Sequence, residues 1–217
     1  MGVHSENNNS KSQDLKRVLY LIQQSGSLML MPRGHKRHLG NSFDTIASHS
    51  YQASVIAYAL SRMEGLTHED GLKCVGMAVF HDLVEARVGD LDFIAKHYVK
   101  IDEEKAIKDQ FSLTGFEHDL EGMLKEYQAK DTQIAQCARD ADSLTQLYTE
   151  WALAWQGNKL AQKWFDSDFN DRVPALRTKS ASKLASLMKE SNPNEWWWSQ
   201  FMQDDTAIDQ EKLLGKP

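Results

Sequence analysis

The sequence of 217 residues contains few cysteines and no long apolar run. Its two cysteines, Cys74 and Cys137, lie in apolar stretches of helical pattern, which excludes the disulfide framework of a small secreted protein. No apolar run approaches the roughly 18 to 20 residues needed to cross a bilayer. The first dozen residues are polar and lack the apolar segment of a signal peptide. We therefore expect a protein of the reducing cytoplasm, without a membrane partner.

An excess of positive charge is also missing, because the formal charge is −6 at pH 7. A broad surface for nucleic acid polymers or anionic membranes needs many basic groups to neutralise phosphates. Any anionic ligand must therefore be bound by a local group of residues. The chain length is that of one ordinary domain.

Regular alternation of apolar and polar residues is absent, and no internal repeat is visible. Apolar residues recur instead with the helical period, which predicts an all-α, single-domain, multi-helix bundle. We place the bundle at residues 13–202, after a disordered lead-in at 1–12 and before a polar tail at 203–217. The expected helices cover residues 13–24, 46–63, 68–88, 92–107, 119–128, 131–155 and 181–188. Asp44 or Thr45 is expected to cap the second helix, Thr67 to cap the third, and Gly89 to end the third.

Two adjacent polar residues, His81 and Asp82, lie inside the apolar pattern of the third expected helix. Burying an imidazole and a carboxylate without partners costs on the order of several kcal/mol, and a metal ion would satisfy both. His49 lies on the buried stripe of the preceding helix, and Asp142 lies at the edge of the apolar face of residues 131–155. Two imidazoles and two carboxylates suit one divalent ion, Mn²⁺, Co²⁺, Fe²⁺, Ni²⁺ or Zn²⁺, held between core helices with positions left for water.

The order and spacing of these four residues resemble the HD-domain superfamily of metal-dependent phosphohydrolases over about residues 26–155. The pattern of that superfamily is a His, a His-Asp doublet and a distant Asp, all on helices. The resemblance implies that His49, His81, Asp82 and Asp142 are the metal ligands. It favours Asp142 over Asp140, because the ligand of the superfamily stands in an Ala-Asp-x-Leu context like residues 141–144. Asp140 is then free to cap, pair or hydrogen-bond.

Glu85 follows His81 by four residues, so we expect it to project from the same helix face one turn on. A carboxylate there can deprotonate a metal-bound water without being a ligand. The segment His-Asp-x-x-Glu followed by Gly-Asp-Leu is similar to the 5′-deoxynucleotidase branch of the superfamily. That resemblance implies catalytic roles for Glu85 and Asp90, and a role for Asp90 in placing the substrate.

Five basic or imidazole side chains occupy residues 33–38, the one local segment that attracts anions. The nucleotidase resemblance implies that an Arg before the first His contacts phosphate. Arg33 lies in a similar place and can clamp two phosphate oxygens, with Arg37 in reserve. The pattern departs at Gly34, where the nucleotidases carry an aromatic residue, so specificity for base and sugar stays open.

The nucleotidase resemblance implies a phosphomonoesterase that releases phosphate from (deoxy)nucleoside 5′-monophosphates by attack of a metal-activated water. Three alternatives stay open: a dinuclear phosphodiesterase, a dinuclear oxygenase, and a metal- or nucleotide-binding module without catalysis. The dinuclear sites need further ligands, for which His97 and His118 are the candidates. A homodimer is also expected, with Trp196, Trp197 and Trp198 either at its surface or packed on the core.

Overall fold

The computed structural model describes residues 14–40 and 44–201, so the expected lead-in at 1–12 and tail at 203–217 lie outside the described residues. Within these ranges the chain forms helices and no strand, apart from an isolated bridge between Pro32 and Thr45. The all-α prediction is confirmed. The α-helices are α1 (Leu15–Ser27), α2 (Lys36–Leu39), α3 (Ile46–Met63), α4 (His68–Phe80), α5 (Glu85–Val88), α6 (Glu103–Phe111), α7 (Glu117–Ala129), α8 (Gln133–Trp155), α9 (Lys159–Asp171), α10 (Lys179–Glu190) and α11 (Glu195–Phe201), with 3₁₀ turns η1 (Ala95–His97) and η2 (Val173–Ala175).

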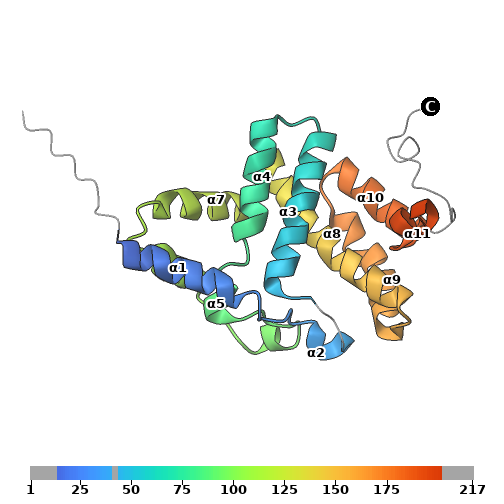
Figure 1. Cartoon of the computed structure of the whole chain (residues 1–217), viewed down its shortest axis with the longest axis horizontal. Helices are drawn as coiled ribbons and strands as arrows, with labels where there is room; N and C mark the ends of the chain where they lie inside the picture. Colours follow the sequence, from blue (N-terminus) through green and yellow to red (C-terminus); the bar gives the residue numbers. More distant parts are fainter. Residues whose placement is uncertain (1–13, 41–43, 202–217) are drawn as a thin grey trace, which may run out of the picture.

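Three helices form the centre of the molecule: α3 and α4 pack side by side, and the long α8 crosses both (Figure 1). At one end, α1, α5, α6 and α7 pack against each other, and α7 also contacts α4 and α8. At the other end, α9 and α10 pack on α8. Every residue that carries a predicted metal ligand therefore lies in or next to the central trio.

Small side chains allow the central helices to approach closely. Ala53 and Ala57 of α3, Ala78 of α4 and Ala141 of α8 are all fully or almost fully buried in one apolar cluster. The distance between packed helices depends on the side chains at the contact, and alanine adds only one carbon atom. Both cysteines lie in this cluster as free thiols. Close packing here is what brings polar side chains from three helices into one place.

Side-chain caps define the starts of α3 and α4. The Thr45 hydroxyl accepts a hydrogen bond from Ser48 N, and the Ser48 hydroxyl accepts one from Thr45 N, which completes a capping box. The Thr67 hydroxyl accepts from Asp70 N. The caps predicted at Thr45 and Thr67 are confirmed.

The third predicted helix is shorter than expected, and the doublet does not lie within it. Helix α4 ends at Phe80, His81 is its C-cap, and a turn separates it from α5, whose C-cap is Gly89. The His81 ring turns back on its own helix, with Nδ1 2.9 Å from Ala78 O. Our prediction of an uninterrupted helix to Gly89 was wrong, because this local contact and the turn after it are not visible in the apolar period.

The prediction of one helix over residues 92–107 was also wrong. Asp92 accepts a hydrogen bond from Ala95 N and starts only the short turn η1. Asp102 then caps α6 by accepting from Lys105 N, so the helix begins at Glu103. Local side-chain caps of this kind compete with a continuous helix.

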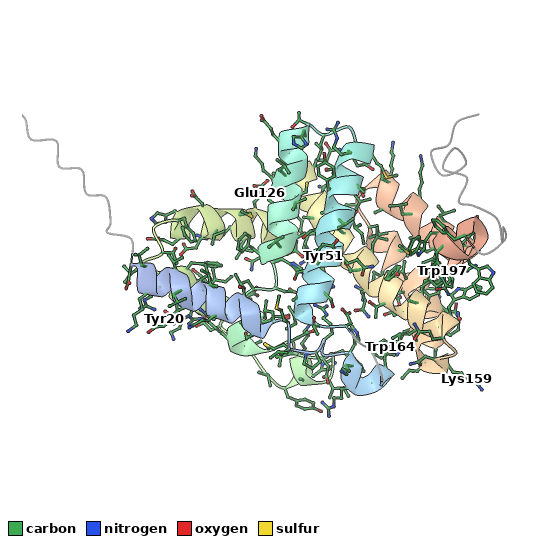
Figure 2. The ribbon with its side chains drawn as sticks, in the orientation of Figure 1. Tyr20, Tyr51, Glu126, Lys159, Trp164 and Trp197 are labelled. Carbon is green, nitrogen blue, oxygen red and sulfur yellow. The ribbon has the colours of Figure 1, made fainter. Side chains whose placement is uncertain are left out.

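Two helices near the C-terminal end were not predicted, α9 and α11. Helix α11 carries the tryptophan run, of which Trp196 is 68% and Trp198 54% exposed. Trp197 lies at the far end of the molecule from α1 (Figure 2). Within this chain the run is thus mostly solvent-exposed, and the homodimer stays a prediction. No helix in the described ranges has the length and apolar character that crossing a membrane requires.

Candidate metal centre and cleft

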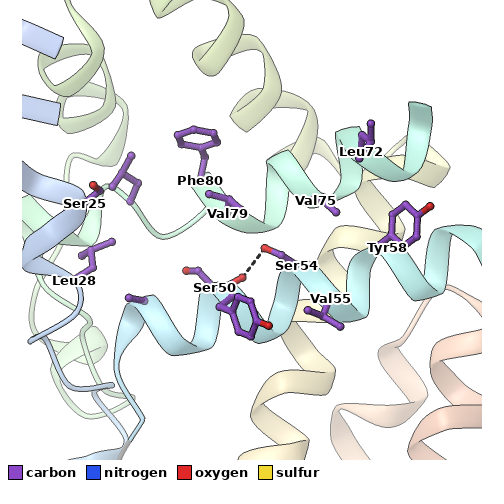
Figure 3. A pocket seen from close by; sticks show the side chains of 13 residues that line it. Ser25, Leu28, Ser50, Ser54, Val55, Tyr58, Leu72, Val75, Val79 and Phe80 are labelled. Carbon is purple, nitrogen blue, oxygen red and sulfur yellow. Dashed lines mark hydrogen bonds between the residues drawn. The ribbon is translucent and has the colours of Figure 1, made fainter. Parts of the chain in front are cut away.

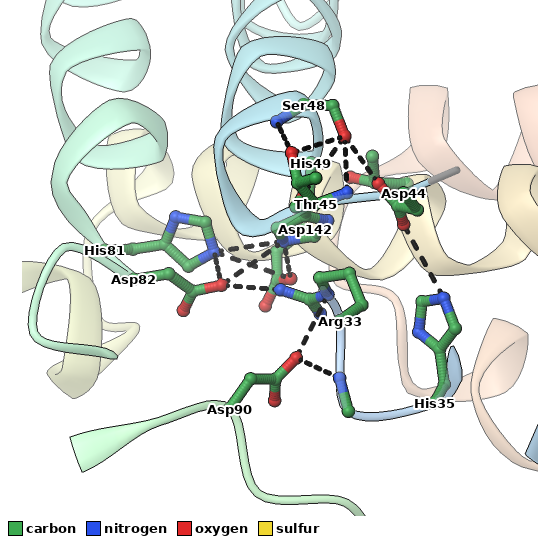
Figure 4. A network of polar contacts seen from close by, with 12 residues as sticks. Arg33, His35, Asp44, Thr45, Ser48, His49, His81, Asp82, Asp90 and Asp142 are labelled. Carbon is green, nitrogen blue, oxygen red and sulfur yellow. Dashed lines mark hydrogen bonds and ion pairs between the residues drawn. The ribbon is translucent and has the colours of Figure 1, made fainter. Parts of the chain in front are cut away.

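Ligand atoms from three helices converge at the centre of the molecule. The Nε2 atoms of His49 and His81 are 3.3 Å apart, and Asp142 Oδ1 lies 3.2 Å from the first and 3.7 Å from the second. All three ligand atoms lie within 4.8 Å of one another (Figure 4). His49 comes from α3, His81 from the end of α4, and Asp142 from α8. The structure therefore brings together three of the four predicted ligands in one compact group.

Neighbouring groups orient two of these ligands. His81 Nδ1 faces the Ala78 carbonyl, which only accepts, so this nitrogen carries the proton and Nε2 of the neutral ring keeps its lone pair for the centre. The Tyr127 hydroxyl donates to Asp142 Oδ2 at 3.2 Å, which leaves Oδ1 facing the imidazoles. Contacts of this kind fix the ligands of metal sites in proteins.

The carboxylates of this cluster need positive charge beside them. Burial alone lowers the pKa of His81, but the Asp82 and Asp142 carboxylates raise it to about 10. Burial raises the pKa of Asp142, whereas His49 and His81 hold it well below its usual range. A protonated His81 thus balances these carboxylates, and a divalent ion bound by the neutral ring would balance them through nitrogen and oxygen donors together. The donor set of His49, His81 and Asp142, with Asp82 beside them, fits such an ion.

Asp82, the fourth predicted ligand, lies between the imidazoles and a buried arginine. Its Oδ2 is 3.1 Å from His81 Nε2 and 3.5 Å from His49 Nε2, and it accepts a 2.8 Å hydrogen bond from Arg33 Nη1. Asp90 Oδ2 lies 3.3 Å from Arg33 Nε on the other side. Arg33 is therefore held at the metal centre by two carboxylates, which raise the pKa of its guanidinium against the effect of burial.

Gly34 explains how Asp90 reaches this group. Its N–H donates to Asp90 Oδ2 at 2.8 Å, and a Cβ added at Gly34 would lie 2.8 Å from Asp90 O and 3.0 Å from Asp92 N. Gly89 has a φ of 77°, a conformation that favours glycine and turns the chain toward Gly34. The aromatic residue that the nucleotidases carry beside their Arg has no room in this backbone.

The remaining sequence candidates lie apart from the metal centre. Arg37 is exposed and pairs with Asp92 at 3.0 Å. His97 and His118 are exposed on η1 and α7, and neither belongs to the described group of possible metal ligands. The described residues thus offer one compact site.

Glu85 begins α5, one turn after the doublet. Burial, together with the charges of Asp82 and Asp90, raises the pKa of Glu85 to about 8, and Arg33 opposes this. Its Oε2 is buried and receives no hydrogen bond from any described residue. The Glu85 carboxyl group thus lies close enough to Asp82, Asp90 and Arg33 for their charges to shift its pKa, and its Oε2 is available to accept a hydrogen bond.

Asp140, the alternative to Asp142, has a structural role. It is 3% exposed, and its carboxylate accepts hydrogen bonds from Arg177 N and from both the N–H and the hydroxyl of Thr178. Thr178 is the N-cap of α10. Asp140 therefore fixes the start of α10 to α8 and leaves the metal centre to Asp142.

A cleft of about 710 Å³ opens from Arg33, Asp90 and Asp142 toward α9. Sequence reasoning missed most of its wall: His35, Phe93, Lys96, Gln146, Glu150, Trp164, Ser167, Asp168, Asp171 and Arg172. Gln146 and Glu150 follow Asp142 at intervals of four residues, a spacing that could have revealed them. Trp164 lies where α9 approaches α2, 5.9 Å between ring centroids from Phe93 (Figure 2).

A second cavity of about 700 Å³ lies between α3 and α4 (Figure 3). Its walls are apolar apart from serine and tyrosine hydroxyls, and include Leu28, Val55, Leu72, Val79 and Phe80. No ionisable carboxylate, imidazole or cationic side chain lines it. Chemistry on a charged substrate therefore belongs to the cleft at the metal centre.

Comparison with known proteins agrees with this geometry. The HD domain family matches residues 26–185, and the chain belongs to that family. A protein solved by structural genomics is 27% identical with a TM-score of 0.67, covering 84% of this chain and 99% of its own. A conserved hypothetical protein from Pyrococcus furiosus is 26% identical with a TM-score of 0.62, covering 79% and 97%. A predicted metal-dependent phosphohydrolase from Magnetospirillum magnetotacticum MS-1, 19% identical with a TM-score of 0.59 over 82% and 92%, shares the fold. No curated protein matches the chain.

The two neighbouring aspartates on α8 should respond differently to substitution. Asp142→Ala removes an anionic ligand, and we expect bound metal per chain to fall at least tenfold. Asp140→Ala leaves the buried N–H groups of Arg177 and Thr178 without an acceptor, and we expect unfolding free energy to fall by about 3 kcal/mol with metal content unchanged. Mass-spectrometric metal analysis and urea denaturation measure the two effects. Loss of metal from the Asp140 variant alone would reverse the assignment.

Glu150 should make stability depend on pH. Burial raises its pKa to about 7, with Asp168 adding to the shift and Gln146 opposing it. Because the folded state holds this proton more tightly than the unfolded state, stability falls as pH rises from about 4.5 to 7. The full cost above pH 7 is about 3 kcal/mol. Glu150→Gln should therefore stabilise the protein at pH 8 and have little effect at pH 4.5. Urea denaturation at both values, with the exposed Glu104→Gln as control, measures this; an equal effect at both would contradict it.

Proposed function

We propose that the protein is a metal-dependent phosphohydrolase that releases phosphate from nucleoside 5′-monophosphates. The observation that carries the proposal is the position of Arg33, whose guanidinium meets Asp82 directly beside the His49, His81 and Asp142 ligand group. A cation site and a buried arginine at one point suit the oxygens of a phosphate group. The HD family, and the description of the Magnetospirillum protein as a predicted metal-dependent phosphohydrolase, are in keeping with this.

The ligands His49, His81 and Asp142, with Asp82, would hold a divalent ion. When bound, such an ion supplies Lewis-acid polarisation of a phosphate oxygen and acidifies a coordinated water. Arg33 neutralises the charge that builds on the phosphate oxygens as water attacks phosphorus. Glu85 would accept a proton from the attacking water through Oε2, which receives no hydrogen bond from a described residue. Asp90 positions Arg33 through the 3.3 Å ion pair and keeps Gly34 in place.

The walls of the cleft support a leaving group of nucleoside type. Phe93 and Trp164 present aromatic rings, on which a base can stack. Polar side chains of α8 line the same cleft, and we expect a sugar to contact them. The alcohol released is thus one with both a polar and a flat apolar part.

A screen for phosphate release tests the proposal. Purified protein is supplied in turn with Mn²⁺, Co²⁺, Fe²⁺, Ni²⁺ and Zn²⁺, and offered ribo- and deoxyribonucleoside monophosphates, bis(p-nitrophenyl) phosphate as a diester, and p-nitrophenyl phosphate. We expect monoesters to be hydrolysed and the diester to be spared. Tight nucleotide binding with no release from any ester would favour a binding module, and preference for the diester would favour a phosphodiesterase.

Glu85→Gln should separate catalysis from metal binding. The amide cannot take a proton, so we expect kcat to fall about 10²- to 10⁴-fold. Metal content should not change, because Glu85 is not among the ligands. Steady-state kinetics and metal analysis on one preparation measure both, with Glu104→Gln as the matched control. Full activity in the Glu85 variant would remove it from this role.

A further inference from the structure

The cleft extends along one face of α8. Asp142, Gln146 and Glu150 are spaced by four residues, so they lie above one another on the same face. With a rise of 1.5 Å per residue, Gln146 is about 6 Å and Glu150 about 12 Å from Asp142 along the axis. Side chains on a helix lean toward its N-terminus, so Glu150 reaches back toward Gln146. These two residues therefore lie where the group bonded to the phosphate must go.

Glu150 is buried without a full set of hydrogen bonds. The residue is 2% exposed, and one oxygen, Oε1, accepts from Gln146 Nε2 at 2.7 Å. The other oxygen, Oε2, is buried and accepts no hydrogen bond from a donor in the described ranges; the neighbouring side chain that interacts with this carboxyl group is Asp168, itself an acceptor that is paired with Arg172. A buried acceptor without a donor is costly to the fold. When Glu150 is ionised it therefore faces the Asp168 carboxylate with no donor between them, and the proposed hydrolysis of phosphate does not use it.

The side of the cleft formed by α9 supplies hydrogen-bond acceptors, and the cation there, Arg172, is already paired with a carboxylate. Asp168 and Asp171 of α9 line the cleft, and Arg172 is bound to Asp168. The other cationic residue of this part of the cleft, Lys96, is an exposed side chain on η1. A second anionic group on the substrate would meet carboxylates here. Hydroxyl groups, which donate, match this wall.

We propose that Glu150, supported by Gln146 and Asp168, accepts hydrogen bonds from the adjacent 2′- and 3′-hydroxyls of a ribose, so that the protein prefers ribonucleoside to 2′-deoxyribonucleoside 5′-monophosphates. The inference rests on the proposed function, and it names the sugar class of the substrate. A carboxylate is a suitable acceptor for the 2′-hydroxyl of ribose. A substrate that lacks this hydroxyl leaves a buried acceptor unpaired, which is the strongest basis for rejecting it.

The ratio of kcat/KM for each ribonucleotide to that for its deoxy counterpart tests the proposal. We measure it for the adenosine, guanosine, cytidine and uridine pairs. We expect at least a tenfold ribo preference in the wild type, a ratio near one in Glu150→Ala, and an intermediate ratio in Glu150→Gln. Glu104→Gln should keep the wild-type ratio. Because both substrates meet the same preparation, a loss of folded protein cancels from the ratio.

Failure of this inference differs from failure of the proposed function. Hydrolysis of nucleotides with no ribo preference, or with a preference that Glu150→Ala leaves unchanged, overturns the subsite and leaves the hydrolase. If no ester is hydrolysed, the hydrolase fails, and calorimetric Kd values for the same nucleotide pairs in the presence of Mn²⁺ still test the subsite. Equal Kd values for both sugars in the wild type would then overturn it.

Discussion

The packing of α3, α4 and α8 places two imidazole nitrogens and a carboxylate oxygen within 4.8 Å of one another. None of these groups can be buried alone at low cost, and the two Nε2 atoms compete for the same partners. The surrounding structure reflects this constraint. Ala78 O and the Tyr127 hydroxyl fix the ligands from behind, while Asp90 and Gly34 hold Arg33 in front. A protein core that needed only stability would have apolar residues here.

The sequence was sufficient to predict those features of the fold and site that depend on the helical period and on helix caps. His49 lies on the buried stripe of α3, Asp142 is on the long α8, and Thr45 and Thr67 cap the helices expected of them. Asp140 could be set aside because the HD resemblance places the ligand in the Ala-Asp-x-Leu context of Asp142, and its bonds to Arg177 and Thr178 agree with that choice. Periodicity predicts which residues face inward, and inward polar residues are few enough to be noticed.

The sequence was insufficient where contacts that the apolar period does not show, local or tertiary, decide the outcome. The His81 ring contacts the Ala78 carbonyl where α4 ends, and Asp92 accepts from Ala95 N at the start of the short η1. Glu150 illustrates the same limit at the cleft. Its helical spacing from Asp142 is visible in the sequence, but its burial requires α9, a helix that the apolar pattern did not reveal. Asp168 and Trp164 come from that helix as well.

The two ends of the cleft make opposite electrostatic demands on a ligand. Near Asp142, the cation site and Arg33 suit an anion, whereas Glu150, Asp168 and Asp171 are carboxylates and the Arg172 guanidinium beside them is already paired with Asp168. A molecule that satisfies both ends carries its charge at one end only and hydroxyl donors beyond it. Inorganic phosphate meets only the first demand, and a nucleoside diphosphate would place a second charge where carboxylates lie. A phosphomonoester of a neutral, hydroxylated alcohol, the substrate class that we propose, would meet both demands.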